Sequence, residues 1–511
     1  MEHLKCTCMI VVALAVTALV DPAAHAVEPV YSELFGRSGE RWEPGGRLPD
    51  FSYAGYHRGE KPLPVLEGSV SVKDFGAIGD GVADDTEAFR HAIEQAHGKT
   101  ILIPAGRYKI TNVLAIKSTG TCLKGAGPLK TTLVCPVPLN DIRKNWGATT
   151  GGRRTSNYSW SGGILRVSGT FQKDALATVT TPCSRGDRAL KVSNVDAFKP
   201  GDTIRLTLTD TPDNSLATHL YADDPGPISE FKGRCRQAFV CRAERVHTEA
   251  SIVFLDRALR SDIRLEWNPQ LYTATSTVEE VGIEDIGFEF PVTPYRGHFT
   301  EVGYNALAMT RVRNCWVRNI HIQNADSGMF VNAENVTLHG ITIESERAAD
   351  AQLASTGHHG ITLSGQDCLL TEFRCKTRFI HDITMTAGSA GNVVSESKGI
   401  DLALDHHRRA PHSNLFTAID LGAGTRMFRS GGGADLGRHC GAYETFWCVR
   451  AEQPQTCPDD WSPPLINLVG VVTDAPRRTN QTARWLEPIP PERLQPCNLH
   501  EAQLRHRLSR Q

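Results

Sequence analysis

Short runs in which apolar and polar residues alternate recur through the middle of the chain. Ile320 and Ile322 belong to one such run, and Leu338, Ile341 and Ile343 belong to another. Alternation with a period of two residues predicts half-buried β-strands. Glycine is frequent, with 45 residues, and aromatic residues make up only 7% of the chain. The composition therefore also favours a turn-rich β protein over a helical bundle.

Strand starts in this region are preceded by an asparagine or aspartate at intervals of 21, 32, 25 and 22 residues. The five positions are Asn314, Asn335, Asp367, Asn392 and Asn414. Periods of this length predict a solenoid with one turn of the chain per repeat, in which the longer intervals are loops on one face. We expect the five side chains to form turns and an internal ladder.

A strand, a turn and a helix are predicted in close succession over Val70–Ala96. Val70 and Val72 indicate a strand, and three glycines up to Gly81 indicate a turn, where positive φ costs little. Asp84 and Glu87 predict a capping box for the following helix. The apolar face of this helix consists of Ala88, Phe89, Ala92, Ile93 and Ala96.

This segment, which reads Val-Ser-Val-Lys-Asp-Phe-Gly-Ala-Ile-Gly-Asp-Gly-Val-Ala-Asp-Asp-Thr-Glu-Ala-Phe-Arg from Val70, resembles the N-terminal signature of the pectate-lyase-like superfamily. The superfamily consists of right-handed parallel β-helices, in which the helix covers the open end of the solenoid. The resemblance implies an all-β, right-handed parallel β-helix with an N-terminal capping helix. It implies a fold and not a reaction.

The N-terminal segment up to Ala26 has the pattern of a secretory signal peptide. Lys5 precedes an apolar run over Met9–Val20, Asp21 and Pro22 end the run, and Ala24-His25-Ala26 supplies small residues for cleavage. The run is too short to span a bilayer. We therefore expect a secreted or periplasmic protein without a membrane span.

The whole chain, with the signal peptide, divides by pattern into six parts. Residues 171–275 lack the solenoid period and show strand–turn–strand patterning, so they predict a small inserted β subdomain. The proline-rich end finishes in an amphipathic segment over Leu499–Leu508, which we expect to close the far end of the solenoid. The predicted parts are a signal peptide (1–26), a lead-in (27–69), the cap with the first coils (70–170), the insertion (171–275), the main coils with the active site (276–460) and a C-terminal cap (461–511).

Charge and composition exclude several classes of protein. The 511 residues include 55 Lys and Arg against 57 Asp and Glu, a formal charge of −2, so the basic surplus of a nucleic-acid-binding protein is absent. Hydrophobic residues at 40% and charged residues at 22% exclude a disordered polyelectrolyte. We expect a globular protein with a sizeable core and no nucleic-acid partner.

Export would place the cysteines in a compartment where disulfides can form. Removing Cys6 and Cys8 with the signal peptide leaves an even number, compatible with disulfides in an oxidising compartment. Buried free thiols are the alternative for at least half of them. Three pairs are close enough in sequence to bridge: Cys235 with Cys241, Cys368 with Cys375, and Cys440 with Cys448.

Histidines and arginines gather in one part of the predicted solenoid. Seven of the 19 histidines fall between His358 and His439, and the densest piece follows Asp401. His381 lies shortly before Asn392, and His407 lies shortly before Asn414. Similar offsets in successive coils bring side chains together at about the 4.8 Å strand spacing. The pattern predicts a cationic, titratable strip on the outside of a sheet.

Such a strip suits the cleavage of an anionic polysaccharide. β-Elimination of a 4-linked uronate requires neutralisation of the carboxylate, a base for the C5 proton and an acid for O4. Arginines can neutralise the carboxylate, and histidine or tyrosine can move the protons. The catalytic candidates are His381, His406, His407, Arg408, Arg426, His439 and Tyr443, and the candidates for substrate binding are Arg409, His358, His359 and Asn414.

Three alternatives compete with a polysaccharide lyase. A glycoside hydrolase would need paired carboxylates, which Asp382, Asp401 and Asp405 could supply. A non-catalytic carbohydrate-binding solenoid would need aromatic platforms at the coil period, and the chain does not show them. A metalloenzyme would need convergent ligands, but His406 and His407 point to opposite faces of a strand.

We expect no cofactor and no metal. Lyases of the superfamily that the chain resembles often use calcium held by a carboxylate cluster, and the sequence contains no clean acidic cluster. Segments from Asp405, Asn414 and Gly424 also resemble exported β-helix proteins that act on polysaccharides. The predicted partner is an anionic polysaccharide.

Overall fold

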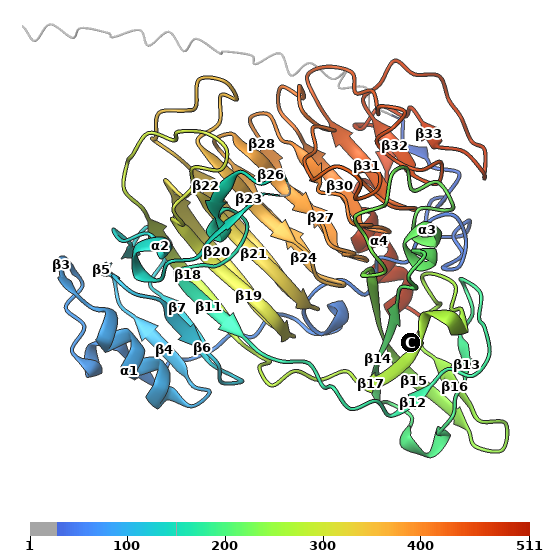
Figure 1. Ribbon diagram of the computed structural model, residues 1–511, viewed down its shortest axis with the longest axis horizontal. Helices are drawn as coiled ribbons and strands as arrows, with labels where there is room; N and C mark the ends of the chain where they lie inside the picture. The colour runs from blue at the N-terminus through green and yellow to red at the C-terminus, as the bar shows by residue number, and fades with distance from the viewer. Residues whose placement is uncertain (1–27, 150, 511) are drawn as a thin grey trace, which may run out of the picture.

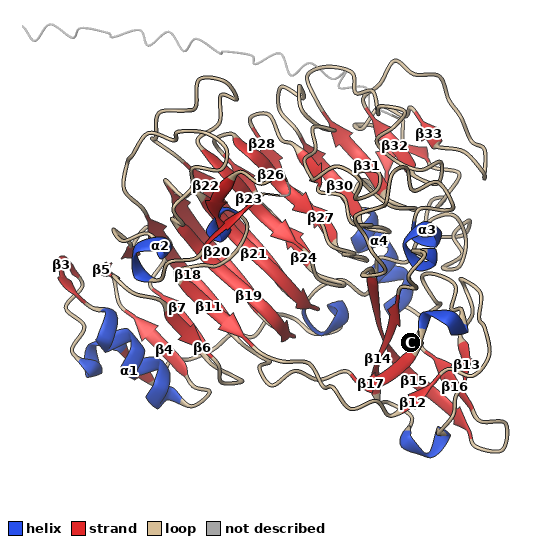
Figure 2. Ribbon diagram, in the orientation of Figure 1, coloured by secondary structure: helices blue, strands red, loops and turns tan. Residues whose placement is uncertain are grey.

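The computed structural model describes residues 28–149 and 151–510, and its architecture is a parallel β-helix. Figure 1 shows the strands stacked coil upon coil from the blue N-terminal end to the red C-terminal end. Strands dominate the regular structure, as Figure 2 shows. The predicted right-handed β-helix with an inserted β subdomain is confirmed. The predicted signal peptide lies outside the described residues.

One long parallel sheet runs through all the coils. Its strands pair in parallel in the order β2, β4, β7, β18, β20, β22, β24, β27, β30, β31, β32 and β33, and the shorter β3, β5, β8, β25 and β28 extend it. The bounds are β2 (Val70–Ser71), β3 (Asp80–Asp84), β4 (Thr100–Ile103), β5 (Gly106–Lys109), β7 (Cys122–Gly125), β8 (Thr131–Val134), β18 (Gly282–Glu289), β20 (Trp316–Gln323), β22 (Thr337–Glu344), β24 (Leu369–Thr371), β25 (Arg374–Cys375), β27 (Val393–Ser395), β28 (Lys398–Gly399), β30 (Leu415–Asp420), β31 (Thr445–Arg450), β32 (Asn467–Val471) and β33 (Trp485–Glu487).

A second parallel sheet of seven strands, called the site sheet below, forms another face of the solenoid. Ile361, Ile383 and Leu404 occupy neighbouring strands in register and point into the core between the sheets. Thr362, Thr384 and Asp405, the next residue of each strand, therefore face outward. In spatial order the strands are β6 (Leu114–Ile116), β11 (Leu165–Ser168), β19 (Asn305–Arg313), β21 (Ser327–Glu334), β23 (Gly357–Leu363), β26 (Phe379–Met385) and β29 (Leu404–His406).

Helix α1 (Thr86–Ala96) packs at the N-terminal end beside β4, as Figure 1 shows. Its predicted apolar face is correct, since Phe89 and Ile93 are buried in the core. The predicted capping box is wrong. Asp84 accepts hydrogen bonds from both the Thr86 amide and the Thr86 hydroxyl, whereas the Glu87 side chain pairs with Arg90.

The insertion carries an antiparallel sheet of its own, within the range predicted from sequence. It includes helix α3 (Ser215–Leu220) and has a separate hydrophobic core. Its strands are β12 (Ala177–Thr178), β13 (Ala189–Lys191), β14 (Thr203–Thr209), β15 (Arg236–His247), β16 (Ile252–Leu255) and β17 (Gln270–Thr273).

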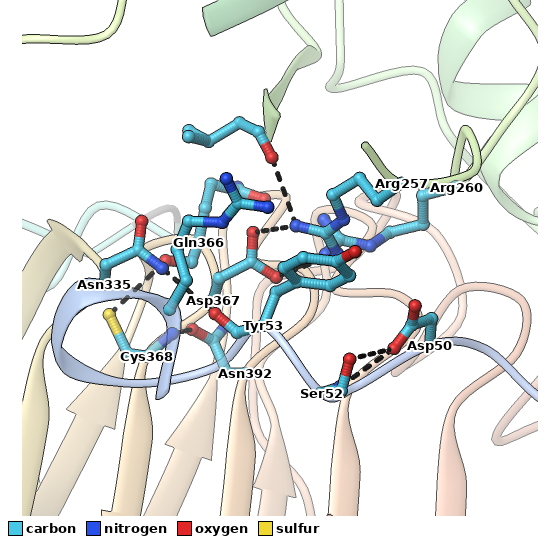
Figure 3. Close-up of polar contacts among 12 residues, drawn as sticks. Asp50, Ser52, Tyr53, Arg257, Arg260, Asn335, Gln366, Asp367, Cys368 and Asn392 are labelled. Atoms are coloured by element: carbon cyan, nitrogen blue, oxygen red, sulfur yellow. Dashed lines mark hydrogen bonds and ion pairs between the residues drawn. The ribbon is translucent and has the colours of Figure 1, made fainter. Parts of the chain in front are cut away.

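A buried ion cluster fastens the insertion to the solenoid (Figure 3). Asp367, at a corner of the β-helix, pairs with Arg257 at 2.9 Å and with Arg260 at 2.5 Å. The Arg257 guanidinium also lies 4.2 Å from the centre of the Tyr53 ring. All three charged side chains are almost completely buried. The cluster therefore joins the insertion, the corner and the N-terminal lead-in.

The predicted ladder of asparagines forms at the corners of successive coils. The Asn392 amide donates to Asn414 Oδ1, and the Cys368 amide donates to Asn392 Oδ1. Asn314 and Asn335 instead adopt left-handed conformations, with φ of 48° and 52°. Short polar side chains tolerate this conformation, so these two residues are turn formers.

The N-terminal lead-in and the C-terminal helix pack together on the flank of the long sheet. Phe35 and Leu499 share a core with Trp447 and Val469 from β31 and β32. Helix α4 (Leu499–Leu508) contacts β30 and so lies beside the coils. The sequence had instead predicted that this segment closes the far end of the solenoid. The remaining elements are β1 (Val30–Tyr31) paired with β34 (Leu494–Gln495), β9 (Trp146–Ala148) paired with β10 (Arg154–Ser156), and α2 (Leu139–Ile142).

A disulfide joins Cys448 to Cys497, so the predicted partner of Cys448 was wrong. Cys440 is buried and free, and the two other predicted pairs are also free thiols. Cys368 and Cys375 diverge, because the first thiol faces the Ala333 carbonyl while the second faces Asp382. Within the described residues, no helix is both long enough and apolar enough to cross a membrane.

Candidate functional site

The outer face of the site sheet carries polar side chains in register. His359 of β23 is paired with His381 of β26, and Thr384 of β26 is paired with Asp405 of β29. His359 Nδ1 lies 3.2 Å from the Thr384 hydroxyl, so both side chains are on the same face. Stacked titratable groups are present at this place, but the predicted positive charge of the strip is not, because burial lowers the pKa of the inner histidines well below 6.5.

Five imidazole rings meet there with one carboxylate. The His359 and His381 rings stack with centres 4.9 Å apart, and the His407 ring lies 5.0 Å from that of His381. His298, from the loop between β18 and β19, brings its ring within 4.4 Å of His358. We call this group the histidine cluster: His298, His358, His359, His381 and His407, with Asp405.

Asp405 fixes the orientation of His407. Its Oδ2 lies 3.0 Å from His407 Nδ1, while its Oδ1 accepts a hydrogen bond from the Gly431 amide. A buried carboxylate facing Nδ1 holds the proton on that nitrogen and leaves the lone pair on Nε2. The His407 side chain is 31% exposed, so it is the ring of this pair that can reach a substrate.

A glycine loop closes over the rings. A Cβ atom on Gly431 would lie 2.5 Å from His407 Cε1 and 2.8 Å from His381 Cε1. The backbone at this position can approach the rings only because it has no side chain. The glycines at 431–433, interpreted from sequence as turn or close-approach residues, include a true close approach.

Burial keeps the inner rings neutral. Desolvation lowers the pKa of His381 to about 3, and the nearby His407 and Arg429 contribute to the same shift. Burial also lowers the pKa of His298 to about 4 and holds the pKa of His358 and His359 well below 6.5. Unprotonated rings can act as bases or as ligands, but they cannot neutralise a substrate carboxylate.

Cationic charge comes from two exposed arginines beside the cluster. Burial is the main cause of the lowered pKa of His298, and the positive charges of the exposed Arg153 and Arg429 contribute to it. Arg153 also lies over the Phe299 ring at 5.4 Å. Neither arginine was among the predicted site residues. Arg429 belongs to the arginine-rich region that contains the histidines, whereas Arg153 comes from a loop far away in sequence.

His406, predicted to transfer protons, points to the interior. It is fully buried, its Nε2 contacts Glu444 Oε1 at 2.8 Å, and its ring packs against Phe416 and Trp461. Adjacent strand residues point to opposite faces, so His407 reaches the outer face and His406 does not. The structure therefore places His406 outside the candidate site.

Arg426 and Asn414 are also held inside the protein. Arg426 is 7% exposed, pairs with Asp382 at 2.7 Å and donates to the Phe379 carbonyl. Asn414 is fully buried in the asparagine ladder and donates to Ser389. Neither side chain is free to contact a polysaccharide, which corrects their predicted roles.

The other predicted residues surround the cluster or lie away from it. Arg408 and His439 contact each other at 3.4 Å, and His439 Nδ1 lies 3.1 Å from the His406 carbonyl. Arg409 is exposed at the next position. The Tyr443 ring lies under the Arg185 guanidinium of the insertion, 4.0 Å from it, and so packs away from the cluster.

The carboxylates proposed for a hydrolase are engaged in structural contacts. Asp382 pairs with Arg426 and accepts the Phe379 and Ala403 amides, and Asp401 pairs with Arg426 and Arg378. Of the three, only Asp405 joins the histidines. A second carboxylate near the cluster, Glu301, lies 3.4 Å from His358 Nδ1, but Glu301 and Asp405 are both fully buried, whereas a hydrolase requires two carboxyl groups that flank the glycosidic bond.

The donor set of the cluster does not suit calcium. Two groups of three side chains bring possible ligand atoms within 4.8 Å of one another: His298, His358 and His381, and His381, Asp405 and His407. Calcium takes six to eight oxygen ligands, whereas these groups are dominated by imidazole nitrogen. The carboxylate-held calcium of lyases that the chain resembles therefore has no counterpart in this cluster.

A basic cavity of about 400 Å³ lies on the same sheet, several strands away from the cluster. Its lining includes Arg143, Lys144, Arg166 and Thr310. Arg166 of β11 belongs to the row of residues in register that ends at Asp405 of β29, five strands away. At about 4.8 Å per strand, the two places are about 24 Å apart.

Comparison with known proteins bears on the N-terminal part of the chain. Residues 69–135 match the family described as "Rhamnogalacturonase A/epimerase, pectate lyase-like". This segment contains the strand, glycine turn and helix on which the resemblance was based. The resemblance to the pectate-lyase-like superfamily is confirmed. The matched segment ends before the first residue of the histidine cluster.

Three curated relatives are similar over short stretches. Mannuronan C5-epimerase AlgE1 of Azotobacter vinelandii is 33% identical over 170 residues, which cover 29% of this chain and 12% of the epimerase. Alginate lyase 7 of the same organism is 31% identical over 165 residues, covering 28% and 19%. Plasmin and fibronectin-binding protein A of Streptococcus pneumoniae (strain ATCC BAA-255 / R6) is 26% identical over 138 residues, covering 25% and 19%. Each match thus spans less than a fifth of the relative's own length.

Proposed function

We propose that this protein is an enzyme that removes the C5 proton of a 4-linked uronic-acid polysaccharide and cleaves the polymer by β-elimination. The observation that carries this proposal is the Asp405–His407 pair, in which a buried carboxylate orients a partly exposed imidazole. Two of the relatives are named for reactions on mannuronan and alginate, which supports a uronate polymer as the substrate class.

Cationic and basic side chains have separate tasks in the proposed reaction. Arg153 and Arg429 pair with the uronate carboxylate and make the C5 hydrogen more acidic. His407 Nε2 accepts that proton, the C5–H electron pair forms the C4=C5 double bond, and the C4–O4 bond breaks. The protonated His407 then returns the proton to O4, so the base becomes the acid of the second half-reaction.

An extended polymer would also contact the basic cavity on the outer face of the site sheet. Arg143, Lys144 and Arg166 line the basic cavity about 24 Å from Asp405 across the site sheet. Their positive charge suits uronates that lie several sugar units from the reacting one. We propose that the chain of sugars runs across the strands from this cavity to the histidine cluster.

A C5-epimerase is the second candidate, favoured by the name of the mannuronan C5-epimerase relative. Epimerisation begins with the same proton removal, but C5 is then reprotonated from the opposite face and O4 stays bound. The glycoside hydrolase is not proposed, because the two carboxylates at the cluster, Asp405 and Glu301, are fully buried behind imidazole rings and cannot flank a glycosidic bond.

One experiment separates the candidates. The purified protein is incubated in D₂O with polymannuronate, polyguluronate or a neutral glucan, and ultraviolet absorbance, deuterium at C5 and new reducing ends are measured. Rising absorbance supports elimination. Deuterium at C5 without absorbance supports epimerisation. Silence on every uronate would contradict the proposed enzyme and favour a binding solenoid.

A His407→Gln variant tests the assigned base, with His321→Gln as the matched control. His321 also contacts a carboxylate, Glu344, at 2.9 Å, but it lies on the long sheet. We expect His407→Gln to lose at least about 100-fold in turnover while His321→Gln stays within about threefold. Full activity of a folded His407→Gln protein would overturn the assignment.

We also propose that the protein acts outside the cytoplasm. The signal-peptide pattern that ends at Ala26 supports export. The Cys448–Cys497 disulfide suits an oxidising compartment. Mass spectrometry of the protein recovered from culture medium or periplasm should find an N-terminus at Val27, and retention of the segment before Val27 would contradict cleavage.

A further inference from the structure

Three histidines of the cluster converge from different parts of the chain. His358 lies in β23, His381 lies in β26, and His298 comes from the loop that crosses their outer face. One ring nitrogen from each lies within 4.8 Å of the other two. The proposed proton transfer uses His407 and Asp405 and gives no task to His298 and His358.

Each buried histidine of this trio has a carboxylate behind it. Glu301 Oε1 lies 3.4 Å from His358 Nδ1, and Asp405 Oδ2 lies 3.4 Å from His381 Nδ1. A carboxylate beside one imidazole nitrogen favours the proton there and leaves the lone pair on the other nitrogen. Carboxylate–histidine pairs of this kind orient the ligands of metal sites in many proteins.

The two carboxylates are themselves held in place. Glu301 accepts hydrogen bonds from the Tyr295 hydroxyl at 2.5 Å and from the Ser159 hydroxyl at 2.9 Å. Asp405 accepts the Gly431 amide at 2.8 Å. The outer layer around the trio is therefore fixed by contacts that do not involve a ligand.

The ring nitrogens of the two buried histidines lack hydrogen-bond partners. His358 and His381 are 1% and 4% exposed, and none of their four ring nitrogens, including the Nδ1 atoms 3.4 Å from the carboxylates, makes a hydrogen bond to a described residue. Buried polar atoms of folded proteins are nearly always satisfied. Unpartnered nitrogens on two neighbouring buried rings indicate a common partner that the described residues do not supply.

We propose that His298, His358 and His381 bind a divalent transition-metal ion of the zinc type. Three imidazoles with one open position form a common arrangement for zinc, and imidazole selects Zn²⁺, Co²⁺ or Ni²⁺ over Ca²⁺ and Mg²⁺. Zinc–nitrogen bonds of about 2.0–2.1 Å in a tetrahedral site place the nitrogens about 3.3 Å apart, so nitrogens within 4.8 Å of one another need to close in by at most about 1.5 Å. His298 is partly exposed, and the open position would face outward on its side.

This inference goes beyond the proposed function and differs from the sequence expectation of no metal. The ion would lie next to the Asp405–His407 pair, where it would add positive charge near the substrate carboxylate. Its binding is measurable without any polysaccharide. A failure of the metal proposal and a failure of the proposed reaction are therefore separate results.

The test uses the full mature chain after dialysis against a chelator. Zn²⁺ binding is measured by equilibrium dialysis with elemental analysis, Co²⁺ binding by visible absorption, and Ca²⁺ is titrated for comparison. We expect about one Zn²⁺ per chain, tetrahedral Co²⁺ bands and no Ca²⁺ binding at the same concentration. Less than about 0.2 equivalents of Zn²⁺ on folded protein would overturn the proposal.

Variants assign the ligands. His298→Ala changes a partly exposed side chain and should weaken Zn²⁺ binding at least about tenfold, as should His381→Gln. His321→Gln, which changes a histidine–carboxylate pair on the other sheet, should bind Zn²⁺ like the unaltered protein. Unchanged affinity in both folded cluster variants would overturn the ligand assignment. Circular dichroism confirms that each variant is folded before binding is read.

Discussion

Replacing Asp405 with asparagine tests whether this carboxylate orients the proposed base. Asp405 Oδ1 accepts the Gly431 amide at 2.8 Å and its Oδ2 faces His407 Nδ1 at 3.0 Å. An asparagine of the same shape can keep the first contact with its oxygen. Its NH₂ group then faces His407 Nδ1, and two N–H donors cannot share one hydrogen bond.

His407 must respond by changing its tautomer. The proton moves to Nε2, the nitrogen that the proposed mechanism uses to accept the C5 proton. The same carboxylate-to-amide change in a Ser–His–Asp triad lowers kcat about 10⁴-fold. Since a positioned acid–base group contributes about 10²–10⁴-fold, we expect Asp405→Asn to lose about 3–5.5 kcal/mol of transition-state stabilisation.

Initial rates on polymannuronate, read by ultraviolet absorbance and by deuterium at C5, give kcat and KM. We expect kcat to fall while KM changes little, because the carboxylate does not touch the substrate. Asp420→Asn is the control, since Asp420 pairs with Lys398 at 2.9 Å on the long sheet. A folded Asp405→Asn protein with a kcat within about threefold of the control would refute the proposed orientation of His407.

Three further predictions concern other parts of the molecule. Gly431→Ala should lower turnover at least about tenfold, because its Cβ would lie 2.5 Å from a His407 ring atom. Gly151→Ala is the control and should keep its turnover, because the nearest neighbour of its Cβ would lie 3.9 Å away. Equal turnover of the two variants would contradict the close approach of Gly431 to the ring. Asp367→Ala should lower the free energy of unfolding, measured by denaturant titration, by about 3–5 kcal/mol, because it leaves two buried arginines unpaired. A loss below about 1 kcal/mol would contradict the stabilising role of the ion cluster. Burial lowers the pKa of His500 from 6.5 to about 4, so the unfolded chain binds a proton that the folded chain refuses, and stability is complete above about pH 6.5 and falls towards pH 4. His500→Gln should therefore reduce the stability difference between pH 6.5 and pH 5 by about 2 kcal/mol, and an unchanged difference would refute the linkage.

Local patterns predicted the main features of the fold. Two-residue alternation identified the strands, and the regular Asn and Asp positions identified the corners, because a solenoid repeats the same local geometry in every coil. Asn392 and Asn414 indeed form the ladder, and Asn314 and Asn335 form left-handed turns. Alternation alone also implied that His406 and His407 point to opposite faces, and they do.

The flank and the disulfide depended on contacts between distant segments. Nothing near Cys448 in sequence indicates Cys497, since the bond follows from the way the C-terminal segment returns along the long sheet. Helix α4 packs on that flank for the same reason, together with the N-terminal lead-in. Sequence proximity had favoured Cys440 as the partner.

The sequence by itself determined the coil, its corners and the region where histidines are dense. Only the tertiary structure decided which of them meet. His298 and Arg153 reach the cluster from loops that are far from β26 in sequence, and Arg426 turns inward to neutralise Asp382. The physical reason is that strand periodicity fixes the face on which a side chain lies. The loops that cross that face, and the burial of charge beneath it, depend on packing between distant parts of the chain, and no local sequence pattern relates those parts.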